Sequence, residues 1–161
     1  MMKRCPIRVL AATALAAGAH LASAAGNPNV PFDVTFEANL CPNPAIVMRL
    51  TFVGRAHMIN LPGNRQITAF PDARTTVTNL VSGNSASYVI TGASHVEVLP
   101  NGNQQVTATG RNLLIVPNAN GHPAGLFLTV GTVTFVLDPA GNEVEVFSGT
   151  GRVVDVCQIL A

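Results

Sequence analysis

Residues 46–58, with the sequence IVMRLTFVGRAHM, alternate apolar and polar side chains. One parity is apolar and holds Ile46, Met48, Leu50, Phe52, Ala56 and Met58. The other parity is mostly polar and holds Arg49, Thr51, Arg55 and His57. A period of two is typical of a β-strand with one buried face. A slip of one residue would bury two arginines, so this pattern also fixes the register. Gly54 predicts a bend or bulge in the strand.

The same alternation occurs just before this stretch, where Phe32, Val34, Phe36 and Ala38 face one way and Asp33, Thr35 and Glu37 the other. Further strands are predicted after it, at residues 66–70, 75–81, 86–99, 104–116, 125–137, 143–147 and 152–157. Clusters of Pro, Gly and Asn predict tight turns between them. Gly92 divides one long segment, and Gly131 either marks a bulge or lies in a strand covered on both faces.

The pattern therefore predicts an all-β protein of eight to ten antiparallel strands joined mostly by sequential hairpins. No apolar residues recur at helical spacing over three turns in the region after residue 24. An up-and-down β-barrel is preferred because it makes the first and last strands neighbours. A β-sandwich, which can also bring the two ends together, is the alternative.

The first 24 residues have the features of a cleaved signal peptide. Lys3, Arg4 and Arg8 precede an apolar run, and Ala22-Ser23-Ala24 has the small residues of a cleavage site. We therefore expect a secreted, extracellular protein made of one domain, residues 25–161. Removal of 24 residues from 161 leaves 137, enough to bury a substantial core. No stretch is long enough to span a membrane.

Cysteine usage agrees with export. Cys5 lies in the predicted signal peptide, ahead of its apolar run, so a lipid-anchored cysteine is not expected. Cys41 and Cys157 remain, and an exported pair predicts one disulfide. A metal or redox site formed by the two thiolates is the alternative, but the spacing is not Cys-x-x-Cys and no histidine is near in sequence.

Charge and composition exclude several classes of function. After residue 24, six arginines face eight acidic residues, a net charge of −2, and there is no lysine or tryptophan. A nucleic-acid-binding surface needs clustered basic residues, so none is expected. No P-loop, dinucleotide fingerprint or G-x-S-x-G motif occurs, and we expect neither a cofactor nor a metal.

Few residues are candidates for chemistry. His95 and Glu97 share a strand face and could form an acid/base pair, but a solvated outer face opposite Val96 and Val98 is the favoured interpretation. His122 lies in the loop 117–124, where a sheet could present it to a ligand, but a plain turn is the favoured interpretation. Glu143 and Glu145 could act as paired carboxylates, but adjacent outward positions on a hairpin are the simpler interpretation. The face of Arg49, Arg55 and His57 could bind an anion or simply be solvated.

The chain resembles a group of small secreted actinobacterial β proteins that contain one disulfide and are mostly uncharacterised. The likeness lies in the leader, the early Cys41, the stretch GLFLTVGTVTF at residues 125–135, the acidic turn at 138–141, and an ending that runs from FSGTG at residue 147 to DVCQILA at residue 161. The resemblance implies export and the disulfide but assigns no activity and no site residues.

We therefore expect a non-catalytic β domain that binds an extracellular partner. One alternative is a barrel that holds a small apolar ligand, lined by Phe32, Phe36, Met48, Phe52 and Met58. Another is a cofactor-free isomerase or hydrolase built around His95, Glu97 or His122. The sequence does not decide whether the protein is an enzyme, but the lack of a catalytic motif favours a protein that is not one.

Overall fold

The computed structural model describes residues 29–116 and 124–161. Both the predicted signal peptide and His122 lie outside these residues. The elements are, in chain order, β1 (Val30–Ala38), β2 (Met48–Leu61), β3 (Arg65–Ala69), β4 (Arg74–Asn79), β5 (Ser85–Val89), β6 (Ala93–Val98), β7 (Gln104–Thr109), β8 (Arg111–Val116), β9 (Gly125–Val130), β10 (Val133–Leu137), β11 (Glu143–Ser148), β12 (Arg152–Asp155) and α1 (Val156–Ile159).

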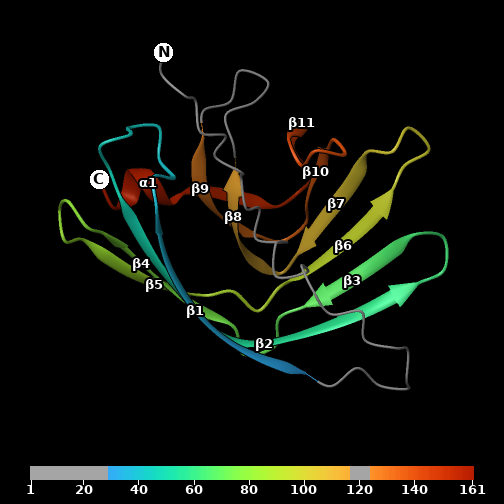
Figure 1. The fold of residues 1–161 in the computed structure, drawn as a ribbon, viewed down its shortest axis with the longest axis horizontal. Coiled ribbons are helices and arrows are strands. Elements are labelled where there is room, and N and C mark those ends of the chain that lie inside the picture. Colours follow the sequence, from blue (N-terminus) through green and yellow to red (C-terminus); the bar gives the residue numbers. More distant parts are fainter. Residues whose placement is uncertain (1–28, 117–123) are drawn as a thin grey trace, which may run out of the picture.

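The strands form two antiparallel sheets, which confirms the predicted all-β class. The larger sheet has nine strands in the order β11-β10-β7-β6-β3-β2-β4-β5, with β1 pairing with β2 beside this path. The smaller sheet has three strands in the order β12-β9-β8. Figure 1 shows the large sheet as a curved layer, with β8 and β9 lying inside its curve. Neither sheet closes on itself within the described residues.

Strand β2 is the longest strand of the large sheet, as its long period-two pattern predicts. Residues 48–56 pair with β1, whose Phe36 lies opposite Leu50. Residues 48–53 also pair with β4, and residues 57–61 pair with β3. Because β1 and β4 both pair with the first half of β2, they lie on its opposite edges.

Five breaks interrupt the strands that follow β2, at residues 70–73, 90–92, 110, 131–132 and 149–151. Hydrogen bonds join breaks to one another, since Phe70 N donates to Gly92 O at 3.0 Å and Gly131 N donates to Gly110 O at 2.8 Å. The breaks therefore form a continuous line across the molecule, which we call the crease.

Glycine is required where the backbones meet at the crease. A Cβ on Gly54 would lie 2.6 Å from the Cα of Ala73, closer than real side chains approach. Gly110 has φ +78°, a conformation that residues with a side chain rarely adopt. The crease explains why twelve strands appear in the described residues where eight to ten were predicted. Segments 86–99, 104–116 and 125–137 are each divided in two, at Gly92, Gly110 and Gly131.

The main core lies between the first part of the large sheet and the three-stranded sheet. Met48, Leu50 and Val77 contribute from the large sheet and are fully buried. Leu126 and Leu128 contribute from β9. Strand β9 is buried on both faces up to Thr129, as the apolar stretch before Gly131 predicts. A smaller aromatic cluster outside this core joins Phe127, Phe135 and Phe147, with ring centroids 5.6 and 6.0 Å apart.

The predicted disulfide is present. Cys41 follows β1, Cys157 lies in α1, and their Cα atoms are 5.6 Å apart. Both half-cystines are buried in the main core, so the bridge joins the two layers at one side. The chain after β12 is a short helix where the sequence predicts that the strand continues to residue 157. Asp155 begins the helix, because its side chain accepts a hydrogen bond from Gln158 N at 3.2 Å.

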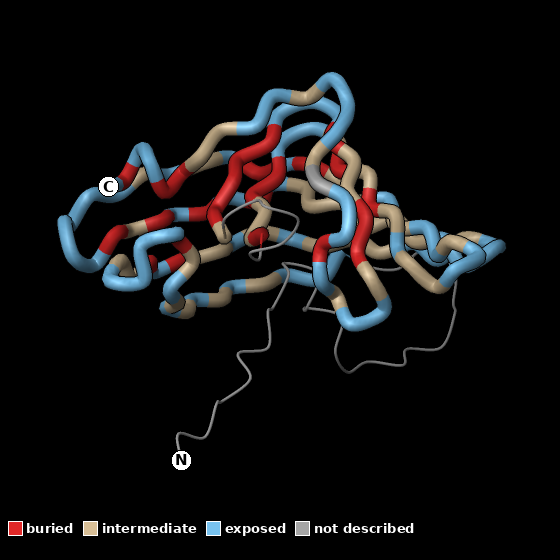
Figure 2. Tube along the Cα trace, turned by 90° about the horizontal axis from the view of Figure 1, so that it is seen from above, coloured by how far each residue is buried: buried red, intermediate tan, exposed pale blue. Residues whose placement is uncertain are grey.

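Two parts of the fold differ sharply in burial. We call β1, residues 48–56 of β2, β4, β5, the three-stranded sheet and α1 the sandwich half. We call residues 57–61 of β2, together with β3 and β6, the wing. No residue of β3 or β6 is buried, whereas β4 and β9 bury three and five residues. In Figure 2 the buried residues accordingly lie in the middle of the molecule and toward the end that holds the C-terminus, while the opposite end shows only intermediate and exposed residues.

Candidate functional site

The wing exposes a regular surface made of three rows of side chains. The rows follow the strand register, in which side chains of paired residues lie next to each other on the same face. We call this surface the wing face, and its rows are His57, Ala69 and Ala93; Ile59, Ile67 and His95; and Leu61, Arg65 and Glu97. It therefore has small residues beside the crease, an aliphatic centre and a charged outer row.

The predicted pair of His95 and Glu97 lies on this face. Both side chains are exposed on β6, on the same side of the sheet, as predicted. No hydrogen bond joins them to each other in the part of the chain that the structure describes. The same part contains no group of three His, Cys, Asp or Glu side chains that could hold a metal ion. The pair therefore lies on an open part of the surface.

Two shallow depressions hollow the wing face and its border. One of about 470 Å³ lies where the wing meets the crease, beside His57 and Phe70, and is otherwise lined mostly by small residues. The other, of about 180 Å³, is lined by residues that include Leu61, Arg65 and His95. The structure therefore brings His57 and His95 to one face but places them at different depressions.

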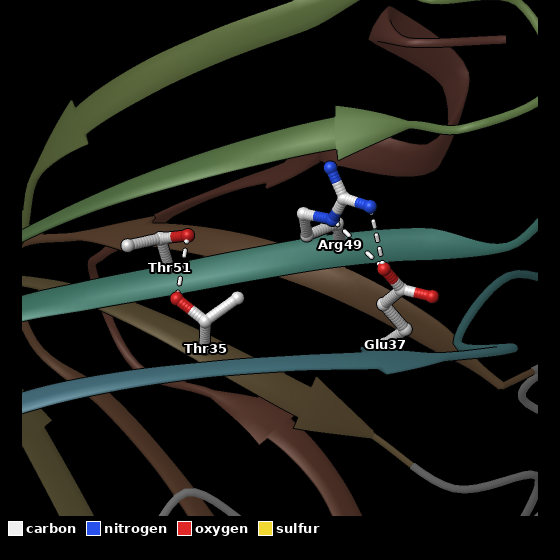
Figure 3. A network of polar contacts seen from close by, with 4 residues as sticks. All are labelled: Thr35, Glu37, Arg49 and Thr51. Atoms are coloured by element: carbon white, nitrogen blue, oxygen red, sulfur yellow. Dashed lines mark hydrogen bonds and ion pairs between the residues drawn. The ribbon is translucent and has the colours of Figure 1, made fainter.

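The face of Arg49, Arg55 and His57 is not a single site. Arg49 is bound to Glu37 of β1, with Nη2 2.7 Å and Nε 2.8 Å from Oε1. Figure 3 shows this pair beside a second contact between the strands, in which the hydroxyls of Thr35 and Thr51 are 3.0 Å apart. The ion pair is half exposed and contributes little stability. Arg49 is thus occupied on the sandwich half, while His57 belongs to the wing.

The glutamates of β11 do not form an exposed pair. Glu145 is exposed as predicted, but Glu143 is only 4% exposed, which corrects the expectation that both are solvated. The reason is a bulge, because the pairing of β10 with β11 shifts between Val136 and Leu137. An irregular register changes the environment of residues that a strict alternation would treat alike.

The side chains with shifted pKa values, Asp138 and Tyr88, lie away from the wing face. Hydrogen bonds from Asn142 and from the backbone of the β10–β11 turn hold the pKa of Asp138 below its usual value. Burial raises the pKa of Tyr88, which packs against the main core. These shifts reflect a turn and a core position, so they identify no acid/base site.

Sequence reasoning missed most of the wing face. Ile59, Leu61, Arg65 and Ile67 were not singled out, because the first three lie in or close to the predicted turn at 61–64 and Ile67 fits an ordinary short strand. One signal was present in Met58 and Ile59, two large apolar side chains that point to opposite faces of one strand. Such a strand must be covered on both faces or leave one apolar face open.

No described helix is long and apolar enough to span a membrane. Comparison with protein-family models, with curated proteins and with solved structures finds no match to this chain.

Proposed function

We propose that the protein is a secreted, disulfide-closed, non-catalytic β domain that binds an extracellular protein through its wing face. The observation that carries this proposal is the exposure of the wing. A sheet is stable when it buries at least one face against another layer, and β3 and β6 have no buried residue. No second layer covers β3 and β6 in the part of the chain that the structure describes, and a partner would supply it.

The composition of the wing face suits a protein partner. Ile59, which is 41% exposed, lies beside Ile67 at the centre, and Arg65 and Glu97 lie in the outer row. An apolar centre with a polar rim is the usual arrangement of a protein interface. The three rows contain no Phe, Tyr or Trp to stack on a sugar or a base.

Secretion is part of the proposal and rests on the leader and on the disulfide. Disulfides persist in oxidising compartments and are rare in the cytosol. The bridge between Cys41 and Cys157 is therefore compatible with an extracellular location. The resemblance to small secreted actinobacterial proteins also stays a prediction.

The two alternative functions have less support. A barrel with an apolar lumen needs interior space, but Met48 is fully buried and the rings of Phe36 and Phe52 stack at 6.0 Å. These side chains fill the space between the sheets. The up-and-down barrel preferred from the sequence stays a prediction. A cofactor-free enzyme would use His95 or Glu97, and both are exposed on an open face.

Affinity capture with matched variants tests the proposal. The full chain, expressed in an oxidising compartment with its own leader, is immobilised and exposed to proteins from the medium of the organism that encodes it. Ile67→Arg places a charge at the centre of the wing face. Thr78→Arg places the same charge on the outer face of β4, where Thr78 pairs with Ser85.

We expect a protein that is retained by the wild type and by Thr78→Arg and lost with Ile67→Arg. Retention of the same proteins by all three chains would show that the wing face is not the binding surface. Circular dichroism of each variant ensures that the loss is not caused by unfolding.

A further inference from the structure

The two faces of the wing differ in how far their side chains form hydrogen bonds within the face. On the face opposite the wing face, Gln66 Nε2 donates to Asn60 Oδ1 at 3.0 Å, and Thr68 and Ser94 lie in the next row. The same two rows of the opposite face also hold Met58 and Val96, so that face mixes polar and apolar side chains. The wing face has no such polar pair at its centre, where Ile59 and Ile67 lie side by side, so a second layer there would exclude water from apolar surface.

The charges of the wing face are self-complementary. Arg65 and Glu97 are register partners on neighbouring strands, and both side chains are exposed. Arg65 Nε donates to Pro62 O at 3.1 Å, and among the described residues Arg65 makes no ion pair with Glu97. A two-fold axis brings the same surface of two copies together. One positive and one negative group on a single face can then pair across that axis, whereas a face of one sign would repel its copy.

Packing two copies face to face would also complete the architecture. Sheets in a β-sandwich pack about 10 Å apart with aliphatic side chains between them. The single-layered wing lacks such a second layer within the described residues. A second wing would provide one: a two-fold axis along the strands, between β3 and β6, sets Arg65 against Glu97 of the second copy at the rim and Ile67 against His95 of the second copy at the centre.

From these observations we propose that a second copy of this chain docks on the wing face to form a symmetric dimer. This inference rests on the proposed function, since it names the protein that the wing face binds. Three strands of five residues cover a footprint of roughly 250 Å². Stable complexes bury about 800 Å² per partner, so the dimer is weak and depends on concentration.

Sedimentation equilibrium of the full chain tests the dimer. Concentrations from about 10 µM to about 500 µM cover the range expected for an interface below standard size. We expect the average mass of the wild type to rise toward twice that of the monomer. Ile67→Glu should remain monomeric throughout, and Thr78→Glu on the outer face of β4 should behave as the wild type.

Charge variants provide a second test at positions that are exposed. Arg65→Glu or Glu97→Arg alone places like charges against each other across the axis, and each should weaken association at least tenfold. The double variant Arg65→Glu/Glu97→Arg restores opposite charges, so it should recover most of the wild-type affinity. A merely structural effect of the single variants would not be reversed in this way.

A wild type that stays monomeric at the highest concentration overturns the dimer. So does equal loss of association in Thr78→Glu and Ile67→Glu, or failure of the double variant to recover. If a monomeric protein still captures another protein that Ile67→Arg releases, only the dimer is wrong. If neither dimer nor capture is observed, the proposed function fails as well.

Discussion

The sandwich half and the wing share strand β2 but differ in how they are stabilised. Leu50 and Ile59 both belong to β2, yet Leu50 is fully buried between two sheets and Ile59 is 41% exposed. The disulfide and α1 also belong to the sandwich half. Burial of apolar side chains is the main source of stability, so the sandwich half maintains the fold. The wing is held mainly by strand pairing, which leaves its face available for binding.

Loss of the disulfide should give the largest effect. Cys41→Ser/Cys157→Ser opens a loop that spans 116 residues, and the chain-entropy model assigns about 4 to 5 kcal/mol to a loop of this size. Guanidinium unfolding, followed by circular dichroism, measures the loss. If the free energy of unfolding fell by less than about 1 kcal/mol, the result would contradict the view that the bridge stabilises the sandwich half.

A matched pair of alanine substitutions compares the two parts of β2 directly. Leu50→Ala creates a cavity in the main core and should cost about 2 to 5 kcal/mol. Ile59→Ala removes a side chain that keeps 41% of its surface exposed, so it should cost less, about 1 kcal/mol. The difference between the two unfolding free energies is the measurement. Equal costs would mean that the wing is as stabilising as the sandwich half.

A buried hydroxyl offers a gain of stability within the sandwich half. Thr75 Oγ1 is buried and has no hydrogen-bond partner among the described residues. Thr75→Val keeps the shape and removes the unsatisfied group, which should add about 1 kcal/mol to the free energy of unfolding. Thr76→Val is the control, because its hydroxyl lies 2.9 Å from that of Ser87 and its removal should not stabilise. Destabilisation by Thr75→Val would indicate a partner for that hydroxyl.

The smallest expected effect concerns the turn between β10 and β11, outside the sandwich half. Asp138 accepts hydrogen bonds from Asn142 N at 2.8 Å and Ala140 N at 2.9 Å, and its pKa is lowered from 3.8. The carboxylate therefore stabilises the turn fully above pH 3.8, and this contribution is lost as the pH falls through the lowered pKa.

The amide NMR shifts of Ala140 and Asn142 should report this titration below pH 3.8 while those of the sandwich half stay constant. In Asp138→Asn the pH dependence should disappear. A titration midpoint above 3.8 would contradict the role of these hydrogen bonds.

Much of the fold followed from local patterns, and the exceptions have physical causes. The period of two located β1 and β2, and the pair of cysteines predicted the bridge. Breaks at the crease were predicted only in part, since Gly92 and Gly131 were recognised but the division at Gly110 was not. The contact that excludes a Cβ at Gly54 comes from Ala73, in the break just before β4, so no local pattern contains it. The burial of Glu143 follows from a bulge in strand pairing for the same reason.

The candidate site shows the same division. His95 and Glu97 were placed on one face by their spacing alone. Their association with Ile67 and Arg65 depends on the pairing of β3 with β6, which lie more than twenty residues apart in the chain and are separated by β4 and β5.

By itself, the sequence determined the strands, their buried faces and the pairing of Cys41 with Cys157, because these depend on side-chain alternation and on the number of cysteines. Tertiary structure decided where the strands break and which sheet each part of a divided segment joins. It also left β3 and β6 without a second layer among the described residues. Those outcomes depend on contacts between distant segments, where backbone approaches and competing burial select one arrangement among many with the same local pattern.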